Sequence, residues 1–187
     1  MKKIGIESHD SGRALYPGRF QPFHLGHLEA VKHMLGEASE IILMIGSALQ
    51  SHTLQNPFTA GERTSMIKLA LDEAGIDPVR YLIIPVNDLQ IHSIWVSHVC
   101  SLVPQFDVVY SNEPLTRRLF VEAGFNVKPI PFFKRKTCSA TEIRKRMLRG
   151  SSWQTLLPKS MAGYIGKIQG VERLRDLAKT DRVEASE

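Results

Sequence analysis

Two histidines and an arginine stand close together near the start of the chain, in a pattern that suits chemistry on phosphate. Arg19, His24 and His27 belong to the stretch G-R-F-Q-P-F-H-L-G-H, residues 18–27. Imidazole and guanidinium groups donate hydrogen bonds to phosphate oxygens, and a helix start nearby would add unpaired N–H groups. We interpret the stretch as a cationic cradle that aligns two mutually repelling anions.

The two histidines also have plainer interpretations. A histidine near a helix start can cap the helix or pack in the core. The spacing of His24 and His27 also resembles half of a zinc site, although residues 18–27 contain no cysteine or carboxylate to complete one. The spacing by itself leaves the cap, the metal pair and the catalytic pair open.

Strands and helices alternate along the chain and must position these residues. Apolar runs predict strands that are covered on both faces, and the amphipathic segments between them predict helices. The predicted strands are residues 13–17, 40–46, 80–86, 106–110 and 126–130, and the predicted helices are residues 26–36, 59–74, 93–102 and 114–123. The fold class is therefore α/β, a Rossmann-like parallel sheet flanked by helices, with a helical C-terminal extension. Such sheets bind ligands at the carboxyl ends of their strands.

We expect a single domain over residues 1–187, with the α/β sheet core in residues 13–135 and a helical part in residues 139–180. A chain of 187 residues is long enough for one domain with a sizeable core. The residues before Gly12 and after Thr180 are expected to be loose ends. The sequence assigns no role to residues 1–12.

Composition favours a soluble globular protein, with 43% hydrophobic and 23% charged residues. No apolar run approaches the ~18 residues that a membrane span needs, and the N-terminus lacks the apolar core of a signal peptide. Cys100 and Cys138 are far apart and give no disulfide framework. We expect a cytoplasmic protein with no membrane partner.

The net charge of +5 raises the question of a nucleic-acid partner. The basic residues gather in residues 134–149, around a second motif rather than in a separate tail. A site for several phosphate groups explains part of this excess, and a solvated helix face explains the rest. We expect no nucleic acid as a partner.

That second motif is Ser139-Ala140-Thr141-Glu142-Ile143-Arg144. Ser139 with Glu142 three residues on is a capping box, which predicts a helix start and needs no further role. The same helix start can also bind a phosphate, with Arg144 one turn further along. The sequence leaves both interpretations open.

Together the two motifs resemble the H-x-G-H and S-x-T-x-x-R signatures of the HxGH nucleotidyltransferase superfamily. Three further features are similar to the archaeal-type nicotinamide-nucleotide adenylyltransferases: G-S-A at residues 46–48, P-F-T-A-G-E-R at residues 57–63, and Trp95. The resemblance extends from about residue 13 to about residue 179, nearly the whole chain.

This resemblance implies an enzyme that transfers AMP from ATP to nicotinamide mononucleotide and forms NAD and pyrophosphate. It implies catalytic roles for His24, His27, Arg19 and Arg144. The residues expected to bind ATP and its phosphates are Gly18, Phe20, Gly26, Asn112, Ser139 and Thr141. Those expected to bind the nicotinamide nucleotide are Trp95, Asp88 and Ser47.

ATP and nicotinamide mononucleotide are thus the expected substrates and NAD the expected product. We expect Mg²⁺ to bind mainly through the substrate phosphates and water, with no dedicated metal ligands in the protein. The resemblance also suggests a homo-oligomer. It leaves open whether the deamidated nucleotide is accepted.

Some assignments have alternatives. From pattern alone Trp95 is a core residue, and Asp88 can equally be a helix N-cap. Where some family members have a phosphate-binding arginine this chain has Gln55, so either His52 or Arg63 compensates or phosphate binding is weaker. An ion pair of Arg63 with Glu62 or Asp88 is as plausible as that substitution.

The function has alternatives as well. The same chemistry on a flavin mononucleotide, phosphopantetheine or a phosphocholine-like acceptor is one. A non-catalytic module that senses adenylates or NAD is the other.

Overall fold

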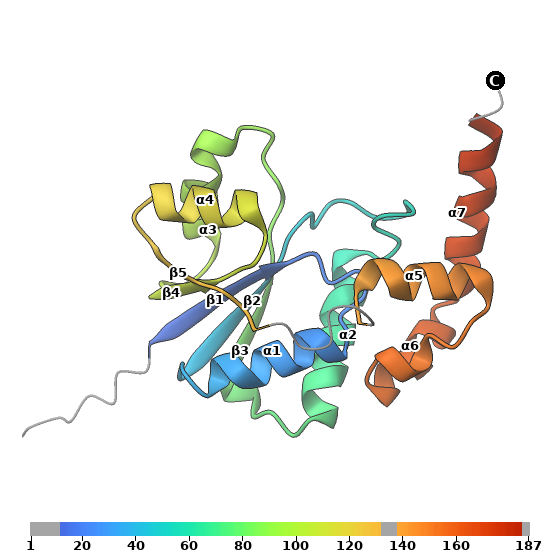
Figure 1. Ribbon diagram of the computed structural model, residues 1–187, viewed down its shortest axis with the longest axis horizontal. Helices are drawn as coiled ribbons and strands as arrows, with labels where there is room; N and C mark the ends of the chain where they lie inside the picture. The colour runs from blue at the N-terminus through green and yellow to red at the C-terminus, as the bar shows by residue number, and fades with distance from the viewer. Residues whose placement is uncertain (1–11, 132–137, 185–187) are drawn as a thin grey trace, which may run out of the picture.

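The computed structural model describes residues 12–131 and 138–184, and a parallel sheet lies at its centre (Figure 1). In this part of the chain the sheet has five strands in the order β3-β2-β1-β4-β5, and all neighbouring strands are parallel. The strands are β1 (Arg13–Gly18), β2 (Glu40–Ile45), β3 (Tyr81–Pro85), β4 (Val108–Tyr110) and β5 (Asn126–Lys128). The predicted Rossmann-like class is confirmed, although the last two strands are shorter than predicted.

The strand order places a switch point beside β1. The chain first adds β2 and β3 on one side of β1, then returns to add β4 and β5 on the other side. Ligands of open parallel sheets bind in the crevice at the carboxyl ends of the two strands where the order reverses. The turns that follow β1 and β4 therefore border the expected site.

Four helices cover the two faces of the sheet, and each face has its own core. The helices are α1 (Leu25–Leu35), α2 (Ala60–Glu73), α3 (Trp95–Leu102) and α4 (Pro114–Glu122), with short 3₁₀ helices η1 (Pro78–Arg80) and η2 (His92–Ile94). Tyr16 of β1 packs with α1 and α2, whereas its neighbour Leu15 packs with α3 and α4. Alternate residues of a strand point to opposite faces, so a nearly continuous apolar strand supplies both cores.

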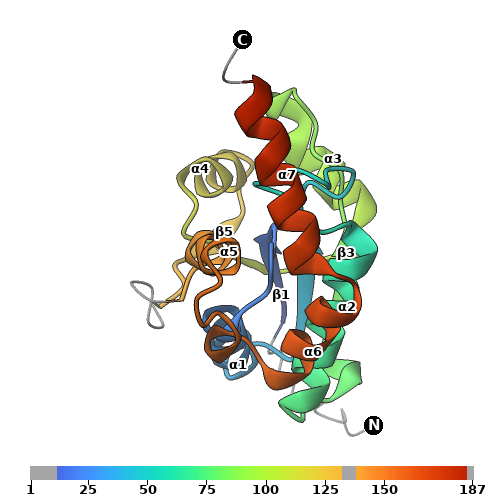
Figure 2. The same ribbon diagram turned by 90° about the vertical axis from the view of Figure 1, so that its right-hand side faces the viewer.

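The C-terminal helices extend the core on the α1 and α2 side. They are α5 (Ala140–Arg149), α6 (Lys159–Lys167) and α7 (Gly170–Glu184), with η3 (Gln154–Leu156) between the first two. Figure 2 looks onto this end of the molecule and shows all three helices in front of the sheet. Trp153 and Leu157 join the same core as Tyr16. Residues 181–184, expected to be loose, continue α7 instead.

Two carboxylates of α2 attach this C-terminal part at opposite ends of the helix. Near the end of α2, Glu73 accepts hydrogen bonds from the backbone N–H groups of Lys159 (3.0 Å) and Ser160 (2.7 Å). At the start, both oxygens of Glu62 accept from Arg173 of α7, each at 2.7 Å. The C-terminal helices are therefore attached to the rest of the protein through contacts with both ends of α2.

One predicted boundary is wrong, and some predictions lie outside the described residues. Arg80 lies in η1, just before the strand in which it was predicted. Among the described residues no helix is both long enough and apolar enough to cross a bilayer. The predicted loose ends at 1–11 and 185–187, and the basic residues at 134–136, lie outside the described residues.

Candidate active site

The start of α1 is built by the two histidines of the H-x-G-H motif. His24 is the N-cap: its Nδ1 accepts from the backbone N–H of His27 (3.3 Å), and the Nδ1 of His27 accepts from the N–H of His24 (3.2 Å). The two rings stack with their centroids 3.6 Å apart. The capping interpretation is therefore correct in geometry, and the cap is made by imidazoles instead of the usual hydroxyl and carboxylate.

This cap fixes which ring nitrogen carries the proton. An Nδ1 that accepts an N–H bond is unprotonated, so each neutral ring holds its proton on Nε2, where it can donate to a ligand. Burial lowers the pKa of His24 to about 4. Burial, and secondarily His24, lower the pKa of His27 well below its usual range. Both rings are neutral at pH 7, so the expected cationic cradle does not owe its charge to them.

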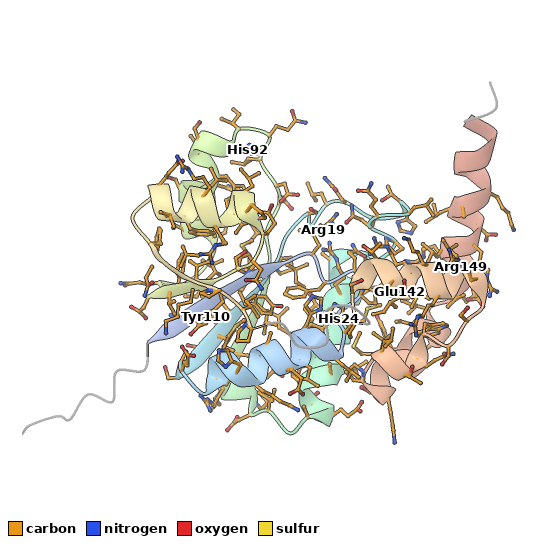
Figure 3. The ribbon with its side chains drawn as sticks, in the orientation of Figure 1. Arg19, His24, His92, Tyr110, Glu142 and Arg149 are labelled. Carbon is orange, nitrogen blue, oxygen red and sulfur yellow. The ribbon has the colours of Figure 1, made fainter. Side chains whose placement is uncertain are left out.

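The positive charge comes from two arginines. Arg19 follows β1 and is exposed, and Arg144 reaches from α5 to donate to the carbonyl oxygen of Gln21 at 2.7 Å. Burial, with the charge of Arg19, lowers the pKa of Arg144. Among the described residues neither guanidinium has a carboxylate within 4.0 Å. In Figure 3, Arg19 and His24 lie where the sheet meets the C-terminal helices. Two unpaired like charges held near each other favour an anion between them.

A cavity of about 220 Å³ is lined by the two histidines but by neither Arg19 nor Arg144. It is bordered by the start of α1, the turns after β4 and β5, and the start of α5. Its lining residues are Tyr16, His24, Gly26, His27, Ala30, Asn112, Ile130, Pro131, Cys138 and Ser139. The cavity thus lies at the switch point of the sheet and brings the two sequence motifs together.

The second motif contributes half of the predicted capping box. Ser139 caps α5 by accepting from the N–H of Glu142 at 3.2 Å. The Glu142 carboxylate does not reach back to Ser139, because it pairs with Arg146 at 2.8 Å. Thr141 lies in the first turn of α5 but does not line the cavity.

Gly18 and Phe20 support the turn after β1. Phe20 has a positive φ of 49° and is buried among Tyr16, Phe23 and His27. A Cβ atom on Gly18 would lie 2.7 Å from the Phe20 ring, so only glycine fits there. Both residues, predicted to bind ATP, shape the backbone around the histidines in this structure.

Asn112 borders the cavity but uses its amide on the backbone. Its Nδ2 donates to the carbonyl oxygen of Ile130 (2.7 Å), and its Oδ1 accepts from the N–H of the same residue (3.1 Å). The side chain thus ties the turn after β4 to Ile130, two residues beyond the end of β5. Asn112 therefore fixes one wall of the cavity.

Two of the three residues predicted for the nicotinamide nucleotide, Trp95 and Asp88, border a second cavity of about 260 Å³, and Ser47 does not line it. The lining residues are Asp88, Leu89, His92, Trp95, Leu115, Thr116 and Leu119. Trp95 is only 9% exposed and packs edge-on against Phe120, with ring centroids 5.5 Å apart. It is therefore a core residue that also borders the cavity. Asp88 accepts from the N–H and the hydroxyl of Ser47, whereas Ile91 is the N-cap of η2, so the capping alternative for Asp88 is wrong.

Arg63 does not replace the missing loop arginine. It is completely buried, and its guanidinium donates only to backbone carbonyls, those of Arg19, Gly46, Ser47 and Thr59. The alternative ion pair with Glu62 is also wrong, because Glu62 pairs with Arg173, and no ion pair of Arg63 with Asp88 exists among the described residues. His52 is exposed and contacts the hydroxyl of Ser51.

Two further residues near the site, Gln21 and Cys138, were not predicted from the sequence. Gln21 exchanges two hydrogen bonds with the backbone of Phe58 (2.9 and 3.0 Å), which ties the H-x-G-H turn to the start of α2. The Sγ of Cys138 lies 3.6 Å from the Nδ1 of His24. No local pattern marks either contact, because the partners are 37 and 114 residues away.

Among the described residues no three histidine, cysteine or acidic side chains gather as a metal site. The zinc interpretation of His24 and His27 is further weakened because both Nδ1 atoms are already engaged by the backbone. These residues fit a metal ion whose ligands would be mainly the phosphate oxygens of a bound substrate.

Comparison with known proteins defines the class of the chain. The sequence model of the cytidylyltransferase-like family matches residues 15–146. A crystal structure of a bifunctional NMN adenylyltransferase/ADP ribose pyrophosphatase from Francisella tularensis has the same fold, with a TM-score of 0.78 at 23% identity. The match covers 92% of this chain and 54% of that one, so this chain spans about half its length. A second structure of that kind contains AMP and a manganese ion and matches with a TM-score of 0.75 at 24% identity, covering 91% of this chain and 53% of that one.

Closer relatives narrow the class. The nicotinamide-nucleotide adenylyltransferase of Methanolobus tindarius is 51% identical over 170 residues, 91% of this chain and 96% of its own. The protein of the same name from Archaeoglobus fulgidus is 52% identical over 173 residues, 90% of this chain and 99% of its own. The chain belongs to the nicotinamide-nucleotide adenylyltransferases, a nucleotidyltransferase family, and the resemblance stated from the sequence is confirmed.

Proposed function

We propose that this protein transfers AMP from ATP to nicotinamide mononucleotide, with release of NAD and pyrophosphate. The relatives' name supports the reaction. The observation that carries it at the level of atoms is the pair of Nε2–H donors, His24 and His27, in the cavity at the switch point of the sheet, with Arg144 bonded to the turn that precedes them and in electrostatic contact with Arg19. That arrangement suits a substrate rich in phosphate.

The reaction needs no covalent bond to the enzyme. A phosphate oxygen of nicotinamide mononucleotide forms a bond to the α-phosphorus of ATP, and the bond between that phosphorus and the β-phosphate bridging oxygen breaks. Pyrophosphate leaves with the electron pair. The work of the protein is to hold two anions in line and to stabilise the negative charge that develops on the transferred group.

Each group of the site has a place in this scheme. His24 and His27 donate from Nε2 to oxygens of the transferred phosphate, and as neutral imidazoles they keep that proton at neutral pH. Arg19 and Arg144 supply the charge through planar guanidinium groups that stay protonated. Arg144 is steadied by its bond to Gln21, within the H-x-G-H turn.

We propose Mg²⁺ as the metal that accompanies the nucleotide. Mg²⁺ typically keeps several waters and binds substrate phosphates with few protein ligands. The described side chains that line the 220 Å³ cavity include no carboxylate, which fits a metal held in that way. When bound, the ion would neutralise phosphate charge.

The direct test is a reaction mixture of the purified protein, ATP, Mg²⁺ and nicotinamide mononucleotide. NAD and pyrophosphate should form in equal amounts. Turnover only with flavin mononucleotide, phosphopantetheine or phosphocholine would move the assignment to another acceptor. Nucleotide binding without any turnover would instead favour the sensor.

Acceptor choice is tested at Trp95. If the indole face of Trp95 meets the cationic nicotinamide ring in the 260 Å³ cavity, Trp95→Ala should raise the acceptor KM about tenfold and leave the ATP KM within about twofold. Val99→Ala is the matched control, since Val99 is buried on the same helix and does not line the cavity. An unchanged acceptor KM in Trp95→Ala would contradict the assignment of this cavity.

We also propose a homo-oligomer that acts in the cytoplasm, as one domain over the whole chain. The unpaired state of Cys100 and Cys138 is compatible with a reducing compartment. Light scattering of the purified protein measures the assembly, and a mass of about 21.0 kDa, that of one chain, would contradict the oligomer.

A further inference from the structure

We propose that Arg63 is a positioning residue that holds the phosphate-binding turn and the acceptor cavity at the separation that adenylyl transfer requires. This inference rests on the proposed function, because it concerns the geometry between the two substrates. Arg63 lines neither cavity, so its effect on the reaction is transmitted through the backbone.

The Arg63 guanidinium joins three segments of the chain. Nη1 donates to the carbonyl oxygens of Arg19 (2.9 Å) and Gly46 (2.7 Å), and Nη2 donates to that of Ser47 (2.9 Å). Nε donates to the carbonyl oxygen of Thr59, the N-cap of α2, at 3.3 Å. One planar group therefore fixes the turn after β1, the turn after β2 and the start of α2 relative to one another.

Each of these turns leads to a different substrate site. Arg19 carries one of the unpaired charges beside the histidines. Ser47 donates its N–H and hydroxyl to Asp88, and Asp88 lines the acceptor cavity. A shift of the Arg63 guanidinium would thus change the position of the acceptor wall relative to the phosphate donors.

The side chain must be an arginine for this role. Four carbonyls in three segments require several donors in one rigid plane, and a lysine ammonium has only three donors on a flexible stem. Arg63 is completely buried, with no carboxylate in ion-pair contact among the described residues, so carbonyl dipoles surround its charge. Burial lowers its pKa to about 10, partly offset by Asp88, and the group stays charged at neutral pH.

Arg80 offers a matched comparison at the other end of the sheet. It also donates to three backbone carbonyls, those of Ser39 (2.9 Å), Leu35 (2.9 Å) and Ala38 (2.8 Å). Those carbonyls precede β2, and none of the three residues lines either cavity. Arg80 therefore has the same kind of contacts as Arg63, without a connection to the substrates.

The experiment compares Arg63→Lys with Arg80→Lys. Both variants should lose thermal stability, since each loses hydrogen bonds to carbonyls. Only Arg63→Lys should lose kcat, by about a hundredfold, the order expected when reacting groups are displaced by about 1 Å. The Kd for ATP alone and for nicotinamide mononucleotide alone should stay within about threefold, because each site by itself remains formed.

A pH profile adds a readout that a purely structural role would not change. The unperturbed pKa of a lysine is lower than that of an arginine, and burial at position 63 would lower it further. The kcat of Arg63→Lys should therefore fall further at alkaline pH, where the kcat of the wild-type protein stays level.

The proposal and the proposed function fail in different ways. If the wild-type protein forms no NAD, the proposed function is wrong. If the wild-type protein forms NAD and Arg63→Lys keeps kcat within twofold, or if Arg80→Lys loses kcat equally, the positioning role is wrong. Arg63→Gln provides the same readouts should Arg63→Lys not fold, and failure of both to fold would mark Arg63 as structural and overturn the proposal.

Discussion

Helices α1 and α2 begin with the same reciprocal pair of hydrogen bonds, made by different side chains. In α2, Thr59 accepts from the N–H of Glu62 and the Glu62 carboxylate accepts from the N–H of Thr59. In α1 the corresponding bonds are made by His24 and His27. Glu62 brings a negative charge to the positive end of its helix, whereas α1 has no acidic residue in its first turn.

This difference separates a structural helix start from one that can bind a ligand. An acid at a helix start interacts favourably with the dipole and occupies the place of an external anion. In α2 that place is filled, and the acid is further neutralised by Arg173 of α7. In α1 the cap is satisfied by neutral rings, so the dipole and the Nε2–H groups are available to phosphate.

The largest effect is expected when the two capping residues of α1 are replaced by those of α2. His24→Thr combined with His27→Glu should keep the helix capped and the melting temperature within a few degrees. The new carboxylate would repel phosphate and both imidazole donors would be gone, so turnover should fall at least about a thousandfold. Steady-state NAD formation and a melting curve measure both effects, and retained turnover would refute the contrast.

Removal of one ring tests the histidines separately. His27→Ala should lower kcat at least about a hundredfold, the loss typical of a missing donor to developing charge. The KM for ATP should change much less than kcat. A rate near that of the wild-type protein would contradict the role given to His27.

The neutral state of the rings predicts a pH dependence of stability. Burial lowers the pKa of His24 to about 4, below the unfolded value of about 6.5, so the unfolded chain binds more protons between these values. The free energy of unfolding is highest above pH 6.5 and should decline by about 2 kcal/mol from this residue as the pH falls from 8 to 5. Urea titrations across that range measure the decline, and His24→Asn, which cannot titrate, should show a shallower slope.

The smallest effect is expected at the α2 cap. Thr59→Ala should lower the free energy of unfolding by about 1 kcal/mol, because one orphan N–H of the helix loses its acceptor. The kcat should stay within about twofold of the wild-type value, since Thr59 contacts Arg63 only through its backbone carbonyl. A large loss of kcat at unchanged stability would show that α2 begins in a ligand site as α1 does.

The fold was predictable because it depends on local patterns. Apolar runs identified the strands, and the alternation with helices identified the parallel sheet and the edge where ligands bind. The α2 cap was predictable as well, since Thr59 and Glu62 are three residues apart and of the usual types. The resemblance of the two motifs to a known family supplied the remaining site residues.

The contacts that shape the site were not predictable, because they join distant residues to backbone atoms. Arg63 bonds a carbonyl 44 residues away, and every residue type has such a carbonyl. One signal did exist: Arg63 shares the buried face of α2 with Met66, Ile67 and Ala70, where helical spacing favours apolar residues. The neutral state of the histidines depends on burial, which spacing does not reveal.

The attachments at Gln21 and Glu62 also bear on how the protein is made. Arg144 bonds a residue 123 positions earlier, and Arg173 bonds one 111 positions earlier. A nascent chain that has emerged from the ribosome only through β5 contains all five described strands. It still lacks Arg144 and Arg173, which bond Gln21 and Glu62 near the starts of α1 and α2. We therefore expect a product truncated after β5 to lack both attachments and the charge of Arg144.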